Sequence, residues 1–266
     1  MKKNEPEGAF LESIRAAAIT ICTILELSTS AVGVRLAEAA EPHPGSTRLG
    51  QHRFCQALML ARHGTRVILG PDGIACPAAA AAFGFRGLPE GLRSGKGLVG
   101  FGIISEPPVG KRMFEDMPKL EPGHVDHLYL FPLEKADCIP DVVVVEGEVE
   151  KLMWILMGYL HLTGGRRIAG STAVLQAVCV DATILPFLEQ RLNHGFGCYG
   201  CRDATDIDIG ESIVGFPVSF LPGITAHLEY LGQKAIPASR GKKVWRALLK
   251  KPGKRRGDAG QPGGPL

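Results

Sequence analysis

The chain has 266 residues, of which 45% are apolar and 21% charged, and this composition excludes a wholly disordered protein. The net charge of +3 is uneven, because residues 239–266 hold nine Lys or Arg and one acid, a net +8 that leaves −5 for the other 238 residues. A mildly acidic body excludes a general nucleic-acid-binding surface there. We expect residues 1–238 to form a single domain and residues 239–266 a basic, largely disordered tail.

Residues 9–36 are strongly apolar, but Glu12, Arg15 and Glu26 interrupt them, and the longest uncharged run is too short to span a membrane. The apolar positions recur every three or four residues, which predicts an amphipathic helix with one face packed on the domain. The seven cysteines fit a reducing compartment, where they stay reduced or bind metal. We therefore expect a cytoplasmic protein with no membrane partner.

Short apolar runs separated by turn residues continue along the first half of the chain. They predict strands at 32–36, 66–69, 98–104 and 127–132, and helices at 53–63, 78–83 and 109–117. Further on they predict a helix at 171–182, capped by Ser171 or Thr172, a strand at 213–219 and a helix at 224–231.

The run from Val142 to Val145 is continuously apolar, as in a strand that is covered on both faces. A long helix at 148–161 follows it and is expected to pack across the sheet. The alternation of strands and helices predicts an α/β fold, with a mixed sheet and helices packed on it.

A weak internal echo suggests two pseudo-symmetric halves, at about 32–120 and 121–235. Leu98-Val-Gly-Phe recurs as Ile213-Val-Gly-Phe, and a Gln-Ala helix in each half bears a cysteine, with a second cysteine further on. Chance similarity of short apolar words is the alternative to an internal duplication. If the duplication is real, each half contributes two cysteines near a pseudo-twofold axis.

Four cysteines stand out as candidate metal ligands: Cys55, Cys76, Cys179 and Cys198. Cys76 precedes Pro77 at a predicted helix start, where backbone N–H groups favour a thiolate. Cys198 lies among glycines, and Gly197 and Gly200 allow the backbone to approach a bulky inorganic group. Arg202 would balance the charge of an anionic cluster or ligand.

Other interpretations of these cysteines stay open. Each one alone also fits a small buried hydrophobic residue, as we expect for Cys22 and Cys138, and Cys201 is ambiguous. A thioredoxin-like Cys198-x-x-Cys201 site needs a helix after the motif, and the sequence from Arg202 onward does not resemble one. A zinc knuckle would need a second such pair, which the sequence lacks.

These residues also carry a family resemblance. The sequence resembles the uncharacterised archaeal-cysteine-rich family, a DUF169-type domain of unknown function, from about Val32 to Leu231. The matching words include Val32-Gly-Val-Arg-Leu, Phe54-Cys-Gln-Ala, Pro140-Asp-Val-Val, and Gly197-Cys-x-Gly-x-Arg. The family's cysteine positions correspond to residues 55, 76, 179 and 198, while Cys201 and the basic tail are additions of this chain. The resemblance implies no established activity.

The leading hypothesis is a four-iron four-sulfur (4Fe-4S) cluster held by these four cysteines, for redox or cluster-dependent small-molecule chemistry. An electron-transfer protein with a redox partner and an enzyme acting on a small molecule both fit. The alternatives are a cluster-free enzyme or binding protein with a reactive Cys76 or Cys198 thiolate, and a structural zinc protein. Nucleic acid would be a partner only through the basic tail.

Overall fold

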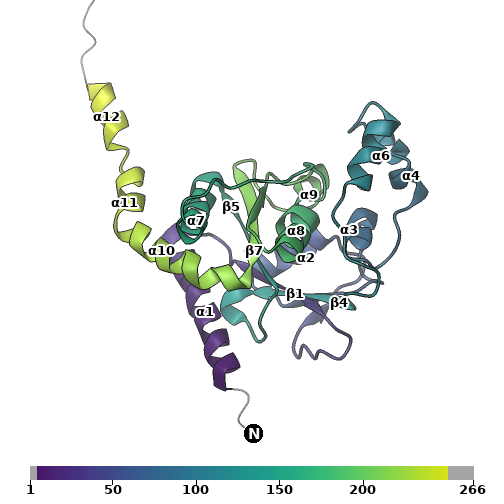
Figure 1. Ribbon diagram of the computed structural model, residues 1–266, viewed down its shortest axis with the longest axis horizontal. Helices are drawn as coiled ribbons and strands as arrows, with labels where there is room; N and C mark the ends of the chain where they lie inside the picture. The colour runs from purple at the N-terminus through teal and green to yellow at the C-terminus, as the bar shows by residue number, and fades with distance from the viewer. Residues whose placement is uncertain (1–4, 251–266) are drawn as a thin grey trace, which may run out of the picture. The chain divides into compact units, whose positions relative to one another are not determined.

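The computed structural model describes residues 5–250 (Figure 1). The chain divides into two compact units, one up to Glu229 and one from Tyr230 onward. This boundary falls nine residues before the expected end of the domain at residue 238, and it lies inside helix α10 (Leu221–Gln233).

A seven-stranded mixed sheet organises the first unit, which confirms the predicted fold class. The strand order is β2-β3-β4-β1-β5-β7-β6, with β2 and β3 parallel and every other neighbouring pair antiparallel. The strands are β1 (Val32–Ala37), β2 (Thr47–Arg48), β3 (Val67–Leu69), β4 (His127–Pro132), β5 (Val142–Glu148), β6 (Asn193–Gly195) and β7 (Glu211–Pro217).

Helices cover both faces of the sheet and form a separate lobe at one end. The helices of the first unit are α1 (Glu5–Leu25), α2 (Phe54–Arg62), α3 (Pro77–Ala82), α4 (Glu90–Arg93), α5 (Lys96–Gly100), α6 (Pro107–Glu115), α7 (Val149–Leu162), α8 (Leu185–Glu189), α9 (Tyr199–Ala204) and the start of α10, with the 3-10 helices η1 (Leu133–Lys135) and η3 (Val218–Phe220) and the π-helix η2 (Ala177–Ile184).

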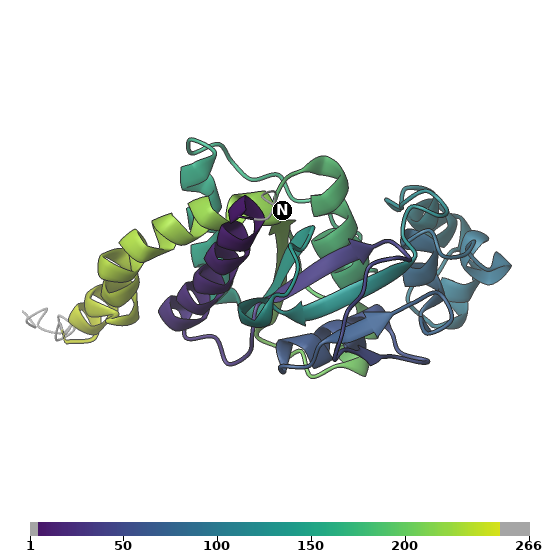
Figure 2. The same cartoon turned by 90° about the horizontal axis from the view of Figure 1, so that it is seen from below.

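The two faces of the sheet carry different layers. Val32, Val34 and Leu36 occupy alternate positions of β1, so their side chains all point to one face of the sheet. There they join the main core with residues of α2, α3 and η2. On the opposite face α7 packs on β5 and β7, and Gly158 of α7 lies against Ile224 of α10. Figures 1 and 2 show α1 at one end of the sheet and the lobe of α4, α5 and α6 at the other.

The apolar run at 142–145 is the strand that the sequence predicts. It forms the start of β5, its four valines are fully buried, and β1 and β7 flank it. The helix predicted after it is α7, which packs across β5 and β7. The first helix is also confirmed, because α1 buries Ile14, Ala18, Ile21 and Leu25 along one face.

Helix α1 is long and apolar enough to cross a membrane by length and composition alone, over Glu7–Leu25. A core helix of a soluble protein or a signal sequence passes the same test, and the buried face of α1 packs beside η1.

Two predicted elements are wrong. Residues 98–104 form the end of α5 and a turn, not a strand, because four glycines lie between residues 95 and 102 and glycine weakens strands. At Gly95 any Cβ would lie 2.0 Å from the carbonyl oxygen of Pro107, so α5 and α6 meet through that glycine. The helix predicted from Ser171 begins only at Ala177, since Val174 and Gln176 have left-handed backbone conformations.

Strand pairing in the sheet is symmetric about the central β1–β5 pair. Gly33 lies opposite Val143, and the registers on the two sides match residue for residue. Val32 lies opposite Pro132 on one side, as Val142 lies opposite Pro217 on the other. In the same way, the pair Val67–Leu130 corresponds to the pair Asn193–Gly215. A twofold rotation about the Gly33–Val143 pair therefore relates the pairing of β3-β4-β1 to that of β6-β7-β5.

This symmetry supports a duplication, but with different boundaries from those expected. The similar sequences that begin at Leu98 and Ile213 do not occupy corresponding positions, because the first lies in α5 and the second in β7. Strand β4 also belongs with the first half, although the expected division at residue 120 assigns it to the second. The cysteines do correspond: Cys55 and Cys179 lie at the starts of α2 and η2, while Cys76 and Cys198 are the N-cap residues of α3 and α9.

The second unit holds two helices beyond α10 in its described part, α11 (Ala235–Arg240) and α12 (Lys243–Lys250). The tail expected to be largely disordered is therefore helical at 243–250. The rest of that prediction falls on residues 251–266, which lie outside the described part of the chain.

Gly215 of β7 allows η2, the element that bears Cys179, to lie directly on the sheet. A Cβ there would lie 1.8 Å from the carbonyl oxygen of Ala182, a contact of backbone with backbone. We expect Gly215→Ala to lower the free energy of unfolding by about 3 kcal/mol, the upper part of the range for overpacked cores. Urea denaturation measures the effect. The control is Gly210→Ala, where a Cβ meets nothing within 4 Å; equal effects of the two changes would contradict the prediction.

Candidate functional site

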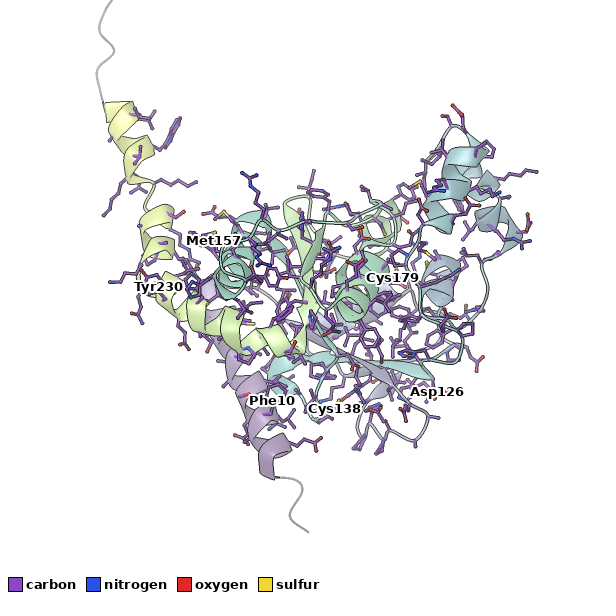
Figure 3. All side chains as sticks on the ribbon, in the orientation of Figure 1. Phe10, Asp126, Cys138, Met157, Cys179 and Tyr230 are labelled. Atoms are coloured by element: carbon purple, nitrogen blue, oxygen red, sulfur yellow. The ribbon has the colours of Figure 1, made fainter. Side chains whose placement is uncertain are left out.

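The structure brings the four predicted cysteines together. Cys55, Cys76, Cys179 and Cys198 all line one cavity of about 280 Å³, although they come from four separate segments. All of the cysteines are free thiols. Cys22 and Cys138 are not part of this lining, and Figure 3 shows Cys138 well apart from Cys179. The separation of Cys22 and Cys138 from the other cysteines agrees with the structural role expected for both.

The rest of the cavity lining is mainly apolar. The inserted lobe between α3 and β4, which has no counterpart in the second half, contributes Leu92, Leu98, Phe101, Ile103 and Phe114. Sequence reasoning missed these residues, because the segment around Leu98 was predicted to be a strand of the sheet. The glycines around it were the signal that could have corrected this. The lobe covers the thiols and lowers the polarity around them.

Burial makes the thiols of Cys55 and Cys179 hard to ionise in the metal-free protein. Burial raises the pKa of Cys55 to about 12, and the nearby Cys198 and Cys76 thiolates would add to that rise. Burial also raises the pKa of Cys179 far above its ordinary range, again with contributions from the other three cysteines. The four sulfurs therefore interact electrostatically, and a bound cation would relieve their mutual repulsion.

Cys198 is the exception. Its pKa is lowered to about 6, first because the Cys201 thiol hydrogen-bonds to the thiolate, and also because backbone N–H groups of Cys201, Ala177 and Gly200 stabilise it. The Cys201 N–H donates to the Cys198 Sγ at 3.3 Å, and the Cys198 N–H donates to the Cys201 Sγ at 2.9 Å. The hydrogen bond between the Cys201 thiol and the Cys198 thiolate raises the pKa of Cys201. The proton therefore stays on Cys201, and Cys198 carries the charge.

Cys201 lines the cavity as well, and it is fully buried. Its place in α9 corresponds to Ala79 of α3, three residues after each N-cap cysteine, so the first half has no equivalent thiol. The helix α9 also corrects an expectation. Strand β6 precedes the Cys198-x-x-Cys201 motif and α9 begins at once after Cys198, so the motif does lie between a strand and a helix.

The three other predicted site residues have different positions. Gly200 lines the cavity and its N–H faces the Cys198 thiolate. Gly197 has a left-handed backbone and lies against the Arg202 side chain, outside the lining. The Arg202 guanidinium is also outside the lining, where it donates to the carbonyl oxygens of Phe196, Asp208 and Glu211. Arg202 therefore holds the loop around α9 and does not face the thiols.

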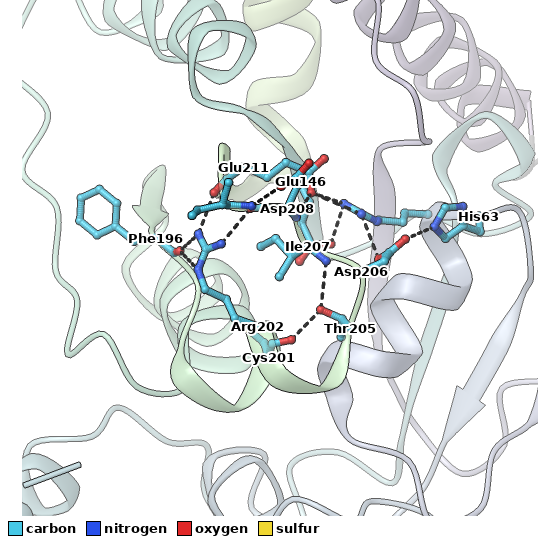
Figure 4. A network of polar contacts seen from close by, with 12 residues as sticks. His63, Glu146, Phe196, Cys201, Arg202, Thr205, Asp206, Ile207, Asp208 and Glu211 are labelled. Carbon is cyan, nitrogen blue, oxygen red and sulfur yellow. Dashed lines mark hydrogen bonds and ion pairs between the residues drawn. The ribbon is translucent and has the colours of Figure 1, made fainter. Parts of the chain in front are cut away.

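A buried ion cluster fixes the elements that carry Cys55 and Cys198 (Figure 4). Arg62, near the end of α2, is 3.3 Å from Glu146 of β5, 3.0 Å from Asp206 and 3.3 Å from Glu211, and both Arg62 and Glu146 are almost fully buried. Burial raises the pKa of Glu146 to about 7, so Glu146 favours the folded state at low pH and that contribution is lost as the pH rises through about 7.

The same two elements are joined near the cavity. The Arg53 Nη1 donates to the carbonyl oxygen of Gly200 at 2.8 Å, and the Gln56 Nε2 donates to the carbonyl oxygen of Ala204 at 3.3 Å. These bonds and the ion cluster hold α2 against α9 from both ends. The positions of Cys55 and Cys198 relative to each other are therefore fixed by polar contacts as well as by packing.

A second, larger cavity of about 580 Å³ adjoins the first. Gln176 lines both cavities, and the second extends between α6 and residues 171–185. Its polar lining includes Thr172 and the buried Asp181, whose carboxylate accepts a hydrogen bond from the Thr172 hydroxyl at 2.5 Å. Burial raises the pKa of Asp181 to about 7.

Comparison with known proteins places the chain in a family. Residues 20–227 match the DUF169 family, described as "uncharacterised ArCR". The chain belongs to this family. It is also 29% identical over 227 residues to the uncharacterized protein MJ0308 of Methanocaldococcus jannaschii, which covers 84% of this chain and 97% of that protein. No solved structure matches the chain significantly. The DUF169 match includes all the cavity cysteines and ends before the second unit.

Arg62→Met should lower the free energy of unfolding by about 3–5 kcal/mol, because it leaves the buried Glu146 beside two other carboxylates without a cation. Arg112→Met is the control, since the Arg112–Asp116 pair is exposed and such pairs contribute about 1 kcal/mol or less. Chemical denaturation at neutral pH compares the two variants. A loss for Arg62→Met no larger than that of the control would show that the cluster contributes little.

Alkylation of the metal-free protein by iodoacetamide should distinguish Cys198 from the other thiols. Its rate should reach half its maximum near pH 6, whereas Cys138, whose pKa burial raises to about 12, should show no plateau at neutral pH. Peptide mapping by mass spectrometry measures each rate. Cys201→Ala should move the Cys198 midpoint upward, because it removes the thiol hydrogen bond. A Cys198 midpoint near the ordinary thiol value of about 8.5 would contradict the assignment.

Proposed function

We propose that this protein binds an iron–sulfur cluster of the 4Fe-4S type through Cys55, Cys76, Cys179 and Cys198. The observation that supports it most is the gathering of four free thiols, from four separate segments, around one mainly apolar cavity. Thiolates are the ligands that such clusters use in proteins. The cluster would supply one-electron transfer or an iron at which a small molecule binds.

The arrangement favours a cluster over a single zinc ion. In residues 5–250, no three His, Cys, Asp or Glu side chains are placed so that they could hold a metal ion as they stand, so the cluster and zinc would both require the sulfurs to move. The thiols instead surround a space of about 280 Å³, which suits a group larger than an ion. Zinc remains the alternative metal, and it would require the sulfurs to close on one point.

The symmetry of the sheet supports the choice of ligands. The pseudo-twofold relation pairs Cys55 with Cys179 and Cys76 with Cys198, so each half supplies two thiols in matching places. Cys201 has Ala79 as its counterpart and its sulfur accepts from the N–H of Cys198. We therefore assign Cys201 to the support of Cys198 and not to the ligand set.

The adjoining cavity favours small-molecule chemistry at the cluster over electron transfer alone. Its volume of about 580 Å³ is within the range of small-molecule sites. Gln176, which lines both cavities, has a strained backbone conformation, and such strain concentrates at functional sites. The partner would then be a small organic molecule that reaches the thiols past Gln176. A cytoplasmic location would keep the thiols reduced and available to metal.

A second candidate is a cluster-free protein with a reactive cysteine. The lowered pKa of Cys198, near 6, and the buried Cys201 three residues later favour it. In this case the Cys198 thiolate would attack a disulfide of the substrate and release one substrate thiolate, and Cys201 would then displace the second substrate thiolate by forming a disulfide with Cys198. This candidate does not explain why Cys55, Cys76 and Cys179 lie around the same cavity.

Anaerobic purification with a visible spectrum and analysis of iron, sulfide and zinc tests these proposals. We expect a brown protein with about four irons per chain. Zinc without iron would support the zinc site. Absence of bound metal, with Cys198 and Cys201 forming a disulfide on oxidation, would support the reactive cysteine.

Single substitutions identify the ligands. Cys198→Ser should abolish or sharply lower the metal content, because the remaining thiolates stay crowded and metal binding is coupled to folding. Cys201→Ser should leave the metal content near wild type, and so should Cys138→Ser, which lies outside the cavity. If Cys198→Ser and Cys201→Ser have equal effects, or if Cys201→Ser alone bleaches the protein, the ligand set is wrong.

A further inference from the structure

Helix α12, considered within its own unit, has one exposed apolar side. Val244, Trp245, Leu248 and Leu249 recur at the spacing that places them on one side of a helix. Their exposed fractions are 78%, 60%, 57% and 67%. Four large apolar side chains within six residues, all of them mostly exposed, are unusual for a soluble surface unless something binds them.

The opposite side of α12 is basic. Lys243 and Arg246 lie on that side by the same helical spacing, Lys242 precedes the helix, and the helix ends at Lys250. In the sequence, Lys251, Lys254, Arg255 and Arg256 continue the positive charge. Asp258 is the only acid from residue 239 onward. The apolar side is therefore framed by cations alone.

This combination matches the surface of an anionic lipid bilayer. Helices that lie in a membrane interface have Lys and Arg on one side and Trp and Leu on the other, and clusters of basic residues attract anionic headgroups. A nucleic acid would use the cations, but it would leave the aliphatic side of Val244, Leu248 and Leu249 exposed to water. Charge and apolarity together thus favour lipid.

We propose that residues 242–250 attach this protein to anionic membrane surfaces, with the apolar side of α12 inserted among the headgroups and its basic residues on the lipid phosphates. This revises the expectation of no membrane partner, and it is independent of the cysteine site. The DUF169 match ends at residue 227, so the attachment would be an addition to the family domain.

Trp245 reports on the binding directly. The chain has two tryptophans, and Trp154 of α7 is mostly buried, so Trp154→Phe leaves Trp245 as the fluorophore. Full-length protein is mixed with vesicles of phosphatidylcholine and phosphatidylglycerol. We expect a blue shift of the fluorescence and sedimentation with these vesicles, both weakened by salt and absent with phosphatidylcholine alone.

Substitution of one apolar residue tests the insertion. Leu248→Ser should weaken binding to the anionic vesicles by about tenfold or more, as expected for the loss of a buried leucine. The matched control is Ile209→Ser, which removes an apolar side chain that is 95% exposed in the first unit; it should bind like wild type.

Three outcomes would overturn the proposal. The first is the absence of both the blue shift and sedimentation with anionic vesicles. The second is unchanged binding by Leu248→Ser, which would show that the apolar side is not inserted. The third is binding to duplex DNA or to RNA, followed by fluorescence anisotropy, without binding to the vesicles, which would assign the tail to nucleic acid.

Discussion

The antiparallel contact of β1 with β5, centred on Gly33 and Val143, is the constraint on which the rest of the domain depends. Gly33 has no substitute there, because a Cβ would lie 2.5 Å from the ring of Phe131 on the neighbouring strand. The outer strands continue from this pair in matching registers, so it fixes where both halves place their helices. A slip of one residue would turn the core side chains to the other face, and α2 and η2 would no longer meet with their cysteines on one cavity.

Burial keeps the thiols of Cys55 and Cys179 protonated in the metal-free protein. Three thiols of the cavity, those of Cys55, Cys179 and Cys201, have raised pKa values, and burial contributes to each rise. Hydrogen bonds to the sulfur of Cys198 instead lower its pKa to about 6. Metal binding would have to release the protons of these thiols and would then offset the repulsion between the resulting thiolates, so it would depend on pH. The ion cluster of Arg62 and the hydrogen bonds of Arg53 and Gln56 hold α2 against α9 without the help of a bound cation.

The strands and the cysteines were the parts most open to prediction, and the reason is physical. Buried strands such as β5 have a continuous apolar pattern that few other elements share, and α1 has a clear helical period. The cysteines could be recognised because a thiol beside Pro77, or among the glycines near Cys198, has an uncommon setting. The site as a whole also depends on contacts between distant segments. The start of η2 depends on the left-handed backbone at Val174 and Gln176, and the Thr172 hydroxyl before it bonds to Asp181, 9 residues away in sequence, which no local pattern reveals.

The residues between α3 and β4 also show why a local sequence pattern was not enough to predict the structure. Their glycines permit helices that pack tightly on one another, yet their apolar residues have the composition of a strand. Helix α9 was missed for a related reason, since its six residues include a glycine and a cysteine and lack a helical period. Its start is set by the reciprocal hydrogen bonds between Cys198 and Cys201, which form a capping box of thiols within the first turn.

The lobe between α3 and β4 also makes the surroundings of the thiols asymmetric. Four thiols related by a twofold axis would present identical surroundings to both ends of whatever they hold, and neither end would be preferred. The lobe exists in one half only, so Leu98, Phe101 and Phe114 line the thiol cavity on one side, and the larger cavity lies beside α6. A group held by the thiols would therefore have different surroundings on its two sides, although the strand pairing of the sheet beneath it is symmetric.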